Sequence, residues 1–107
     1  MFEIGSDGTI RLTRGDTAEF TVTVTQADGS PYILAEGDLL EFAVKEYPGG
    51  DNEVIYKTGQ AITIEPADTE ELPVRQYYYG VRITLSDGKV NTIIPKTQFI
   101  IENEVVG

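Results

Sequence analysis

The sequence contains no cysteine and no histidine, and these two absences remove much of the chemistry that small enzymes use. Without cysteine there is no disulfide and no thiol nucleophile, and without histidine the commonest general base and nearly all zinc sites are excluded. Ser6, Ser30 and Ser86 stand beside turn residues, with no activating base near them in sequence. Glu70 and Glu71 are typical of a solvated loop rather than of a glycosidase pair. We therefore expect a protein that is not an enzyme and that holds no cofactor or metal.

Basic residues are also scarce. The chain has 8 lysines and arginines against 18 aspartates and glutamates, which gives a formal net charge of −10. Nucleic acids and anionic membranes attract clustered positive charge, whereas the basic residues here are scattered along the chain. We therefore expect no nucleic-acid partner and no membrane partner, and we interpret the acidic charge as a source of solubility.

Long apolar runs are missing as well. No stretch approaches the roughly 18 apolar residues that a membrane-crossing helix needs. Residues 1–12 alternate polar and apolar side chains and lack a basic segment followed by an apolar one, so we expect no signal peptide. The sequence thus predicts a protein that is made in the cytosol and leaves it only as part of an assembly.

What the chain does have is alternation between apolar and polar residues, which is the pattern of β-strands. Predicted strands lie around residues 10–13, 19–25, 40–45, 53–57, 61–65, 77–85, and 90–94 with 99–101. A chain of 107 residues can bury one core but not two. The pattern predicts an all-β fold with a single domain over residues 1–107, with Phe42, Val81 and Ile83 facing its core. We expect an immunoglobulin-like β-sandwich of about seven antiparallel strands.

Turn residues separate the predicted strands. Asp87 and Gly88 predict a two-residue hairpin turn. That turn sets up three facing pairs of inward residues: Leu85 with Val90, Ile83 with Thr92, and Val81 with Ile94. Residues 66–73 break the alternation and predict a short helical turn between the two sheets, with Asp68 or Thr69 as its cap.

The inward positions change parity near the end of the chain, because they are even-numbered up to Ile94 and odd-numbered at Phe99 and Ile101. A bulge or bend near Pro95 and Lys96 would absorb the extra residue, since proline cannot donate to a ladder. The alternative is that Ile100 faces inward while Phe99 covers a partner surface.

Three consecutive tyrosines are the most unusual local feature of the sequence. Alternation points Tyr77 and Tyr79 into the core, with their hydroxyls bonded at its rim. Tyr78 then points the other way. It is either a plain surface residue or an aromatic contact for a sugar or a protein partner.

Two further groups have competing interpretations. Thr21, Thr23 and Thr25 form one uncharged strand face that is either a partner contact or simply solvated. Arg14, Gly15 and Asp16 spell the tripeptide that integrin ligands display, but their position between two strands predicts an ordinary turn.

Three stretches together resemble small phage and prophage proteins of Gram-positive bacteria. The first is Thr13-Arg14-Gly15-Asp16-Thr17 with the Phe20, Val22 and Val24 strand. The second runs from Asp28-Gly29 through Pro31-Tyr32 and Gly37-Asp38 to the strand at residues 40–45. The third joins Pro66-Ala67-Asp68-Thr69 to the tyrosines, Asp87-Gly88, Thr92-Ile93-Ile94-Pro95 and residues 99–105. The likeness is to immunoglobulin-like domains of tails or baseplates, including the amino-terminal domain type of baseplate upper proteins.

This resemblance implies a non-catalytic structural or adaptor protein that acts through protein–protein contacts, either with other virion proteins or with itself. It implies assembly in the host cytoplasm followed by residence in the virion. The alternative function is a carbohydrate-binding β-sandwich module that uses exposed Tyr32, Tyr47 or Tyr78 against sugar rings.

Overall fold

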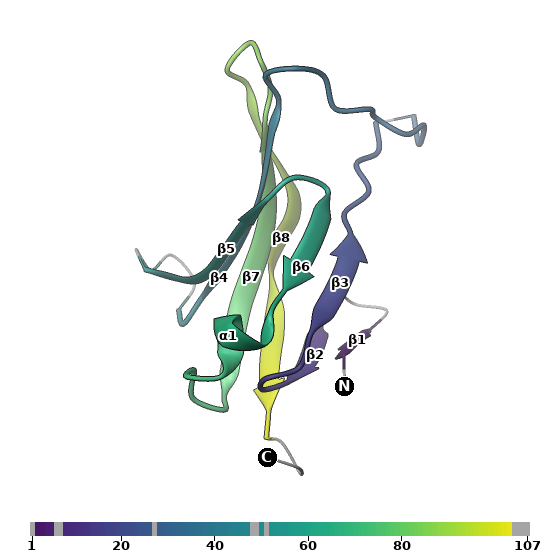
Figure 1. The fold of residues 1–107 in the computed structure, drawn as a ribbon. Helices are drawn as coiled ribbons and strands as arrows, with labels where there is room; N and C mark the ends of the chain where they lie inside the picture. Colours follow the sequence, from purple (N-terminus) through teal and green to yellow (C-terminus); the bar gives the residue numbers. More distant parts are fainter. Residues whose placement is uncertain (1, 6–7, 27, 48–49, 51, 104–107) are drawn as a thin grey trace.

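The computed structural model describes residues 2–5, 8–26, 28–47, 50 and 52–103, and most of them lie in strands. Figure 1 shows the arrangement of the elements within these ranges. In chain order they are β1 (Phe2–Ile4), β2 (Ile10–Thr13), β3 (Ala18–Thr21), β4 (Leu39–Lys45), β5 (Glu53–Thr58), β6 (Ala61–Ile64), α1 (Pro66–Thr69), β7 (Gln76–Thr84) and β8 (Val90–Glu102). The predicted all-β fold is confirmed.

The strands form two sheets. One has six strands in the order β1-β2-β8-β7-β4-β5, and the other consists of β3 and β6. The small sheet lies in front of the large one in Figure 1, and Phe20 of β3 meets Phe42 of β4 edge-on with ring centroids 5.5 Å apart. We call the covered side of the six-stranded sheet its inner face and the opposite side its outer face.

The expectation of antiparallel strands throughout is wrong at one pair. β2 and β8 run parallel, with Ile10 opposite Phe99 and Leu12 opposite Ile101. These two strands lie near opposite ends of the sequence, so no hairpin dictates their relative direction. The parallel pairing still places these four apolar side chains on the inner face. The alternation of the sequence predicts the facing of each residue but not the direction of the strand beside it.

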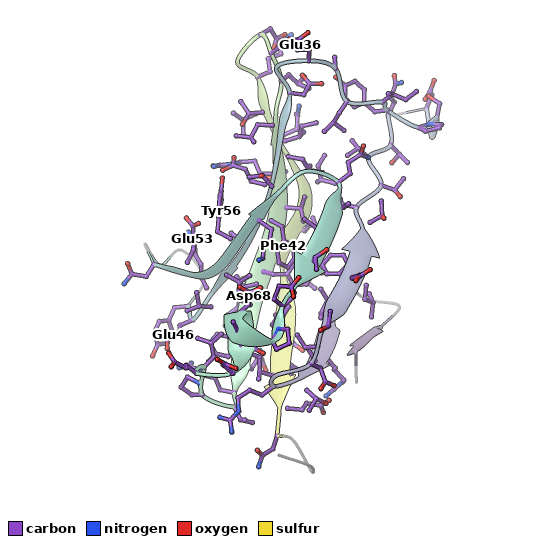
Figure 2. The ribbon with its side chains drawn as sticks, viewed as in Figure 1. Glu36, Phe42, Glu46, Glu53, Tyr56 and Asp68 are labelled. Atoms are coloured by element: carbon purple, nitrogen blue, oxygen red, sulfur yellow. The ribbon has the colours of Figure 1, made fainter. Side chains whose placement is uncertain are left out.

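The inner face and the small sheet enclose a single apolar cluster, and Figure 2 shows Phe42 in its centre. The large sheet contributes Ile10, Leu12, Leu40, Phe42, Val44, Ile55, Tyr77, Tyr79, Val81, Ile83, Phe99 and Ile101. Ala18, Val22, Val24, Ile62 and Ile64 face them. The predicted inward facing of Phe42, Val81 and Ile83 is therefore confirmed.

The hairpin between β7 and β8 differs from its prediction. Leu85 N–H donates to the Lys89 carbonyl, so the loop has three residues, and Gly88 closes it with a φ of +93°. Next to the loop, the extra residue shifts the register by one, which places Ile83 opposite Asn91 instead of Thr92. A second irregularity, between Val81 and Arg82, takes up this shift, so Val81 pairs with Ile94 as predicted. Val90, expected inside, is 55% exposed on the outer face.

The predicted bulge at Pro95 and Lys96 is confirmed. Tyr79 pairs with Thr97 and Val81 with Ile94, so Gly80 alone faces two residues of β8. A Cβ at position 80 would lie 3.3 Å from the Ile94 carbonyl oxygen, which explains why glycine stands there. Phe99 is fully buried beyond the bulge, so the alternative with Ile100 facing inward is wrong.

The helical turn predicted within residues 66–73 is α1, although its cap differs. Glu65 is the N-cap residue, and the Asp68 carboxylate accepts a hydrogen bond from the Glu65 N–H at 2.7 Å. Thr69 is fully buried, and its hydroxyl accepts a hydrogen bond from the Gly15 N–H at 2.8 Å. Arg14 donates to the Leu72 carbonyl, so the Arg14-Gly15-Asp16 turn is packed against the helix as a structural element.

We expect Phe42→Ala to lower the free energy of unfolding by about 3–5 kcal/mol, measured by urea denaturation. Phe42 contacts Tyr79 and Phe99 on its own sheet, at centroid distances of 5.5 and 6.5 Å, in addition to Phe20 of the other sheet. Ile33→Ala is the control, because Ile33 is 85% exposed and its truncation should change stability by less than about 0.5 kcal/mol. Equal losses in the two variants would contradict the proposed core.

Candidate binding site on the outer face

The outer face of the six-stranded sheet is open to solvent in the part of the chain that the structure describes. Leu39, Tyr56 and Val90 lie on this face and are 42%, 45% and 55% exposed. The small sheet covers the inner face only (Figure 1). A sheet face that carries exposed aromatic and aliphatic side chains is a candidate surface for a partner or a ligand.

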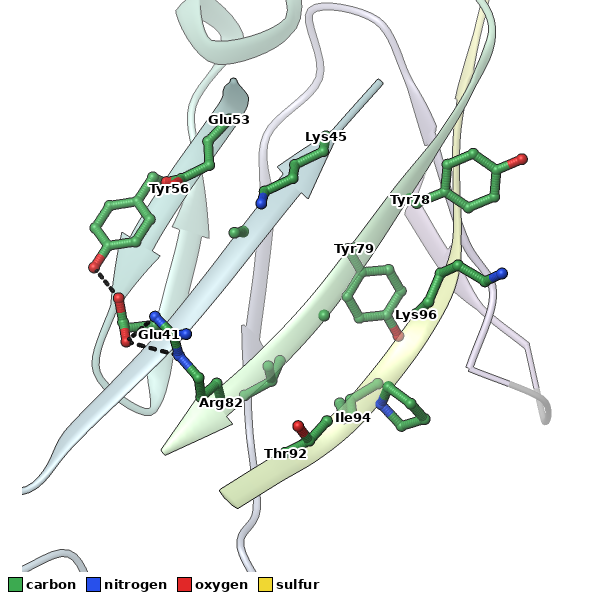
Figure 3. A pocket seen from close by; sticks show the side chains of 14 residues that line it. Glu41, Lys45, Glu53, Tyr56, Tyr78, Tyr79, Arg82, Thr92, Ile94 and Lys96 are labelled. Carbon is green, nitrogen blue, oxygen red and sulfur yellow. Dashed lines mark hydrogen bonds and ion pairs between the residues drawn. The ribbon is translucent and has the colours of Figure 1, made fainter. Parts of the chain in front are cut away.

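Strand register builds a shallow hollow of about 290 Å³ in the middle of this face. Ala43 of β4 stands opposite Tyr56 of β5 on one side and Gly80 of β7 on the other, so the two smallest side chains form the floor. We call this site the outer hollow, and Figure 3 shows it from close by. The residues around the floor that matter below are Glu41, Lys45, Glu53, Tyr56, Tyr78, Arg82 and Lys96.

Glu41 holds one side of the outer hollow in place. The Tyr56 hydroxyl donates to its Oε2 at 2.6 Å, while Arg82 donates to its Oε1 from Nε at 3.2 Å and from Nη2 at 3.0 Å. The hydrogen bond from Tyr56, followed by those from Arg82, holds the pKa of Glu41 below its usual value. The same bond to a carboxylate raises the pKa of Tyr56. The Tyr56 ring is thus fixed as a neutral phenol at the rim.

Two lysines give the outer hollow a charge unlike that of the rest of the chain. Lys45 and Lys96 have no carboxylate within ion-pair distance among the described residues, and Arg82 shares Glu41 with Tyr56. Three cations and the two carboxylates of Glu41 and Glu53 line the site, so it is locally positive in a chain with a net charge of −10. Negatively charged groups are the natural complement of such a site.

The three tyrosines point as alternation predicts. Tyr77 is fully buried and donates to the Pro73 carbonyl at 2.7 Å, and buried Tyr79 donates to the Gly8 carbonyl. Tyr78 is half-buried on the outer face, where Figure 3 shows its ring beside Lys96. The candidate contact residue Tyr78 therefore belongs to the outer hollow.

The threonine face lies elsewhere. Thr21, Thr23 and Thr25 are exposed, while the intervening Val22 and Val24 are buried. Because the valines point toward the six-stranded sheet, the threonines point out of the opposite side of the molecule from Tyr78. The structure does not bring these four candidate residues together.

The other two tyrosines considered for sugar binding are also outside the hollow. Tyr32 is half-buried, and its hydroxyl donates to Asp38 Oδ2 at 2.6 Å. This hydrogen bond joins two residues of the loop before β4. Tyr47 is 60% exposed with the Arg75 guanidinium 5.2 Å from its ring centroid. Tyr56 was not singled out in the sequence, because only the pairing of β5 with β4 brings it to the same hollow as Tyr78.

Two further kinds of feature, metal-binding clusters and membrane-spanning helices, can be compared with the described residues. No group of three acidic side chains there is arranged to hold a metal ion, and no helix among them has the length and apolar character to cross a bilayer. Ser30 and Ser86 are exposed turn residues, whereas Ser6 and residues 104 and 105 lie outside the described ranges. No protein-family model matches the chain, and no curated protein matches it in sequence.

Replacing Glu41 tests the geometry of the hollow. In Glu41→Gln the phenol of Tyr56 no longer bonds a negative charge, so we expect the pKa of Tyr56 to fall toward its ordinary value. Nuclear magnetic resonance of the tyrosine ring signals across a pH titration measures this. Tyr32, which bonds Asp38, should titrate as in the unmodified protein. An unmoved Tyr56 titration would contradict the bond to Glu41.

Asp38 supplies a second, pH-dependent test. Its carboxylate accepts hydrogen bonds from the Tyr32 hydroxyl and from the N–H groups of Ala35 and Ser86, which tie the loop before β4 to the β7–β8 hairpin. The Tyr32 bond first, and then the Ala35 bond, hold the pKa of Asp38 below its usual value. A depressed folded-state pKa stabilises the fold above the unfolded-state pKa, and this stability is lost as the pH falls through the folded-state pKa.

We therefore expect Asp38→Asn to melt at a lower temperature than the unmodified protein at neutral pH. The difference should shrink as the pH falls from about 4, where Asp38 of the unfolded chain takes up a proton, through the lower folded-state pKa of Asp38. Thermal melting followed by circular dichroism measures both effects. Glu36→Gln is the control, because Glu36 is an exposed residue of the same loop, and this variant should melt at the same temperature as the unmodified protein. A pH-independent difference for Asp38→Asn would contradict the assigned role.

Proposed function

We propose that this chain is a non-catalytic structural or adaptor protein of a phage or prophage virion, of the tail or baseplate type, acting through protein–protein contacts. It is assembled in the host cytoplasm and then resides in the virion. The resemblance that spans nearly the whole sequence supports the virion assignment. The observation that carries the contact role is the open outer face, where a large sheet leaves apolar side chains in solvent.

We also propose that the fold is immunoglobulin-like, and the strand order supports this. The run β8-β7-β4-β5 corresponds to strands G, F, C and C′ of a variable-type domain, and β3 with β6 corresponds to B and E. Tyr77 lies at the start of β7 and bonds the Pro73 carbonyl four residues upstream, as the tyrosine corner of such domains does. Fold alone does not dictate function, so the contact role depends on the side chains that the sheet exposes.

Two surfaces fit a protein partner. Leu39 and Val90 stand on either side of Thr84 in one cross-strand row of the outer face, beyond the Glu41 and Arg82 row. Burying two exposed aliphatic side chains favours association through the hydrophobic effect. The exposed threonine face of Thr21, Thr23 and Thr25 is the second surface, and it would bind through hydroxyl groups.

Co-expression tests the proposal. The chain is produced together with the products of its flanking genes, and complexes are isolated by affinity and size-exclusion chromatography. We expect a tail or baseplate protein to co-elute with it. The double variant Leu39→Asp, Val90→Asp should lose the complex, because it places charge in the apolar contact.

The matched control is Ile33→Asp, which adds a charge at an exposed aliphatic residue outside the sheets. This variant should keep the complex, and unchanged melting temperatures would show that all variants are folded. Absence of any virion protein from the eluate would overturn the proposal. A complex that survives the double variant but is lost on Thr23→Asp would move the contact to the threonine face.

A further inference from the structure

We propose that the outer hollow binds an acidic saccharide, with Tyr56 and Tyr78 packing against sugar rings and Lys45 and Lys96 contacting the acid groups. This activity goes beyond assembly, because a virion contact through Leu39 and Val90 does not need a sugar. The proposal depends on four features of the hollow: its floor, its aromatic walls, its hydrogen-bonding groups and its charge.

The floor and walls have the shape that a flat ring needs. Ala43 contributes one methyl group and Gly80 no side chain, so a ligand can approach the sheet closely. Tyr56 is two strands away from Gly80, which corresponds to about 10 Å at the usual strand spacing. Tyr78 stands on the other side, one cross-strand row further along. Sugar rings have an apolar C–H face that packs against such aromatic side chains.

The polar groups suit hydroxyls. Arg82 keeps guanidinium N–H groups beyond the two nitrogens that bond Glu41, and Glu41 oxygens retain lone pairs after accepting from Tyr56 and Arg82. Each group is already oriented by the others, so little side-chain entropy is lost on binding. A sugar hydroxyl, which both donates and accepts, can bond to either partner.

The charge selects an acidic ligand. Lys45 of β4 is opposite Tyr78 in the ladder, and Lys96 of β8 lies beside the Tyr78 ring, whereas the Lys45 side chain extends toward the β5 side of the hollow (Figure 3). Neither lysine forms an ion pair within the described residues. The bulge opposite Gly80 places Lys96 at this rim, which is the kind of re-aimed side chain that bulges produce near functional sites. In a chain with a net charge of −10, the locally positive hollow is a place where charge complementarity favours an anion.

An acidic peptide fits less well than a saccharide. The hollow lies on the face of the sheet, where main-chain N–H and C=O groups are already paired in the ladder, whereas extended peptides gain their affinity by pairing with an edge strand. Its volume of about 290 Å³ lies at the small end of the range of about 300–1,000 Å³ that is usual for pockets that bind small molecules.

The experiment titrates the whole chain with a panel of short oligosaccharides that bear uronate, sulfate or phosphate groups, followed by nuclear magnetic resonance. Neutral oligosaccharides of equal length and a glutamate-rich peptide complete the panel. We expect acidic saccharides to shift the amide signals of Ala43, Tyr78, Gly80 and Lys96, with an affinity that falls as salt is added. Neutral saccharides should bind more weakly.

Variants locate the site. Tyr78→Ala should weaken binding by about fivefold to tenfold through loss of ring contact, while Tyr56→Phe should retain most of the affinity because the ring remains. Lys45→Gln with Lys96→Gln should weaken binding and reduce its salt dependence. The controls are Tyr47→Ala and Lys89→Gln, an exposed tyrosine and an exposed lysine that do not line the hollow.

Three outcomes would overturn the proposal. One is that no acidic saccharide of the panel binds, and another is that the control variants lose as much affinity as those in the hollow. The third is that the glutamate-rich peptide binds at the same residues more tightly than any saccharide, which would make the site a peptide site. None of these results affects co-elution with virion proteins, so the two proposals fail separately.

Discussion

Packing of the two sheets against one another is the interaction on which the rest of the structure depends. Phe20 reaches Phe42 across the gap between the sheets, and Phe42 in turn contacts Tyr79 and Phe99 on its own sheet. Without cysteine no covalent link supports this contact, so apolar burial has to stabilise the domain. Side chains that alternate between the two faces of each strand meet that requirement, and they leave every second residue available on the outer face.

One structural constraint connects the core to the candidate site. The bulge at Pro95 and Lys96 restores the inward facing of Phe99, and the same bulge brings the Ile94 carbonyl so close to position 80 that only glycine fits without displacement. Gly80 then forms half of the floor of the outer hollow, and Lys96 stands at its rim. A feature that completes the core therefore also shapes the surface opposite it.

The distribution of charge separates two parts of the outer face. The chain is strongly acidic, yet three of its 8 basic residues line a single hollow that has only two carboxylates. The apolar row of Leu39 and Val90 lies beyond the Glu41 and Arg82 row on the same face. The outer face thus has an apolar part suited to a protein contact and a positive, aromatic part suited to an acidic ligand, and the two are far enough apart in register to be tested by different substitutions.

Alternation in the sequence by itself determined the all-β class, most of the core and the bulge, because the facing of a strand residue depends on its parity and not on which strand lies beside it. Phe42, Val81, Tyr77 and Phe99 were assigned correctly for this reason. Direction, register and neighbours depend on hydrogen bonds between distant segments, which parity does not encode. Only the tertiary structure could therefore decide the parallel pairing of β2 with β8, the three-residue loop that exposes Val90, and the meeting of Tyr56 with Tyr78 around one hollow.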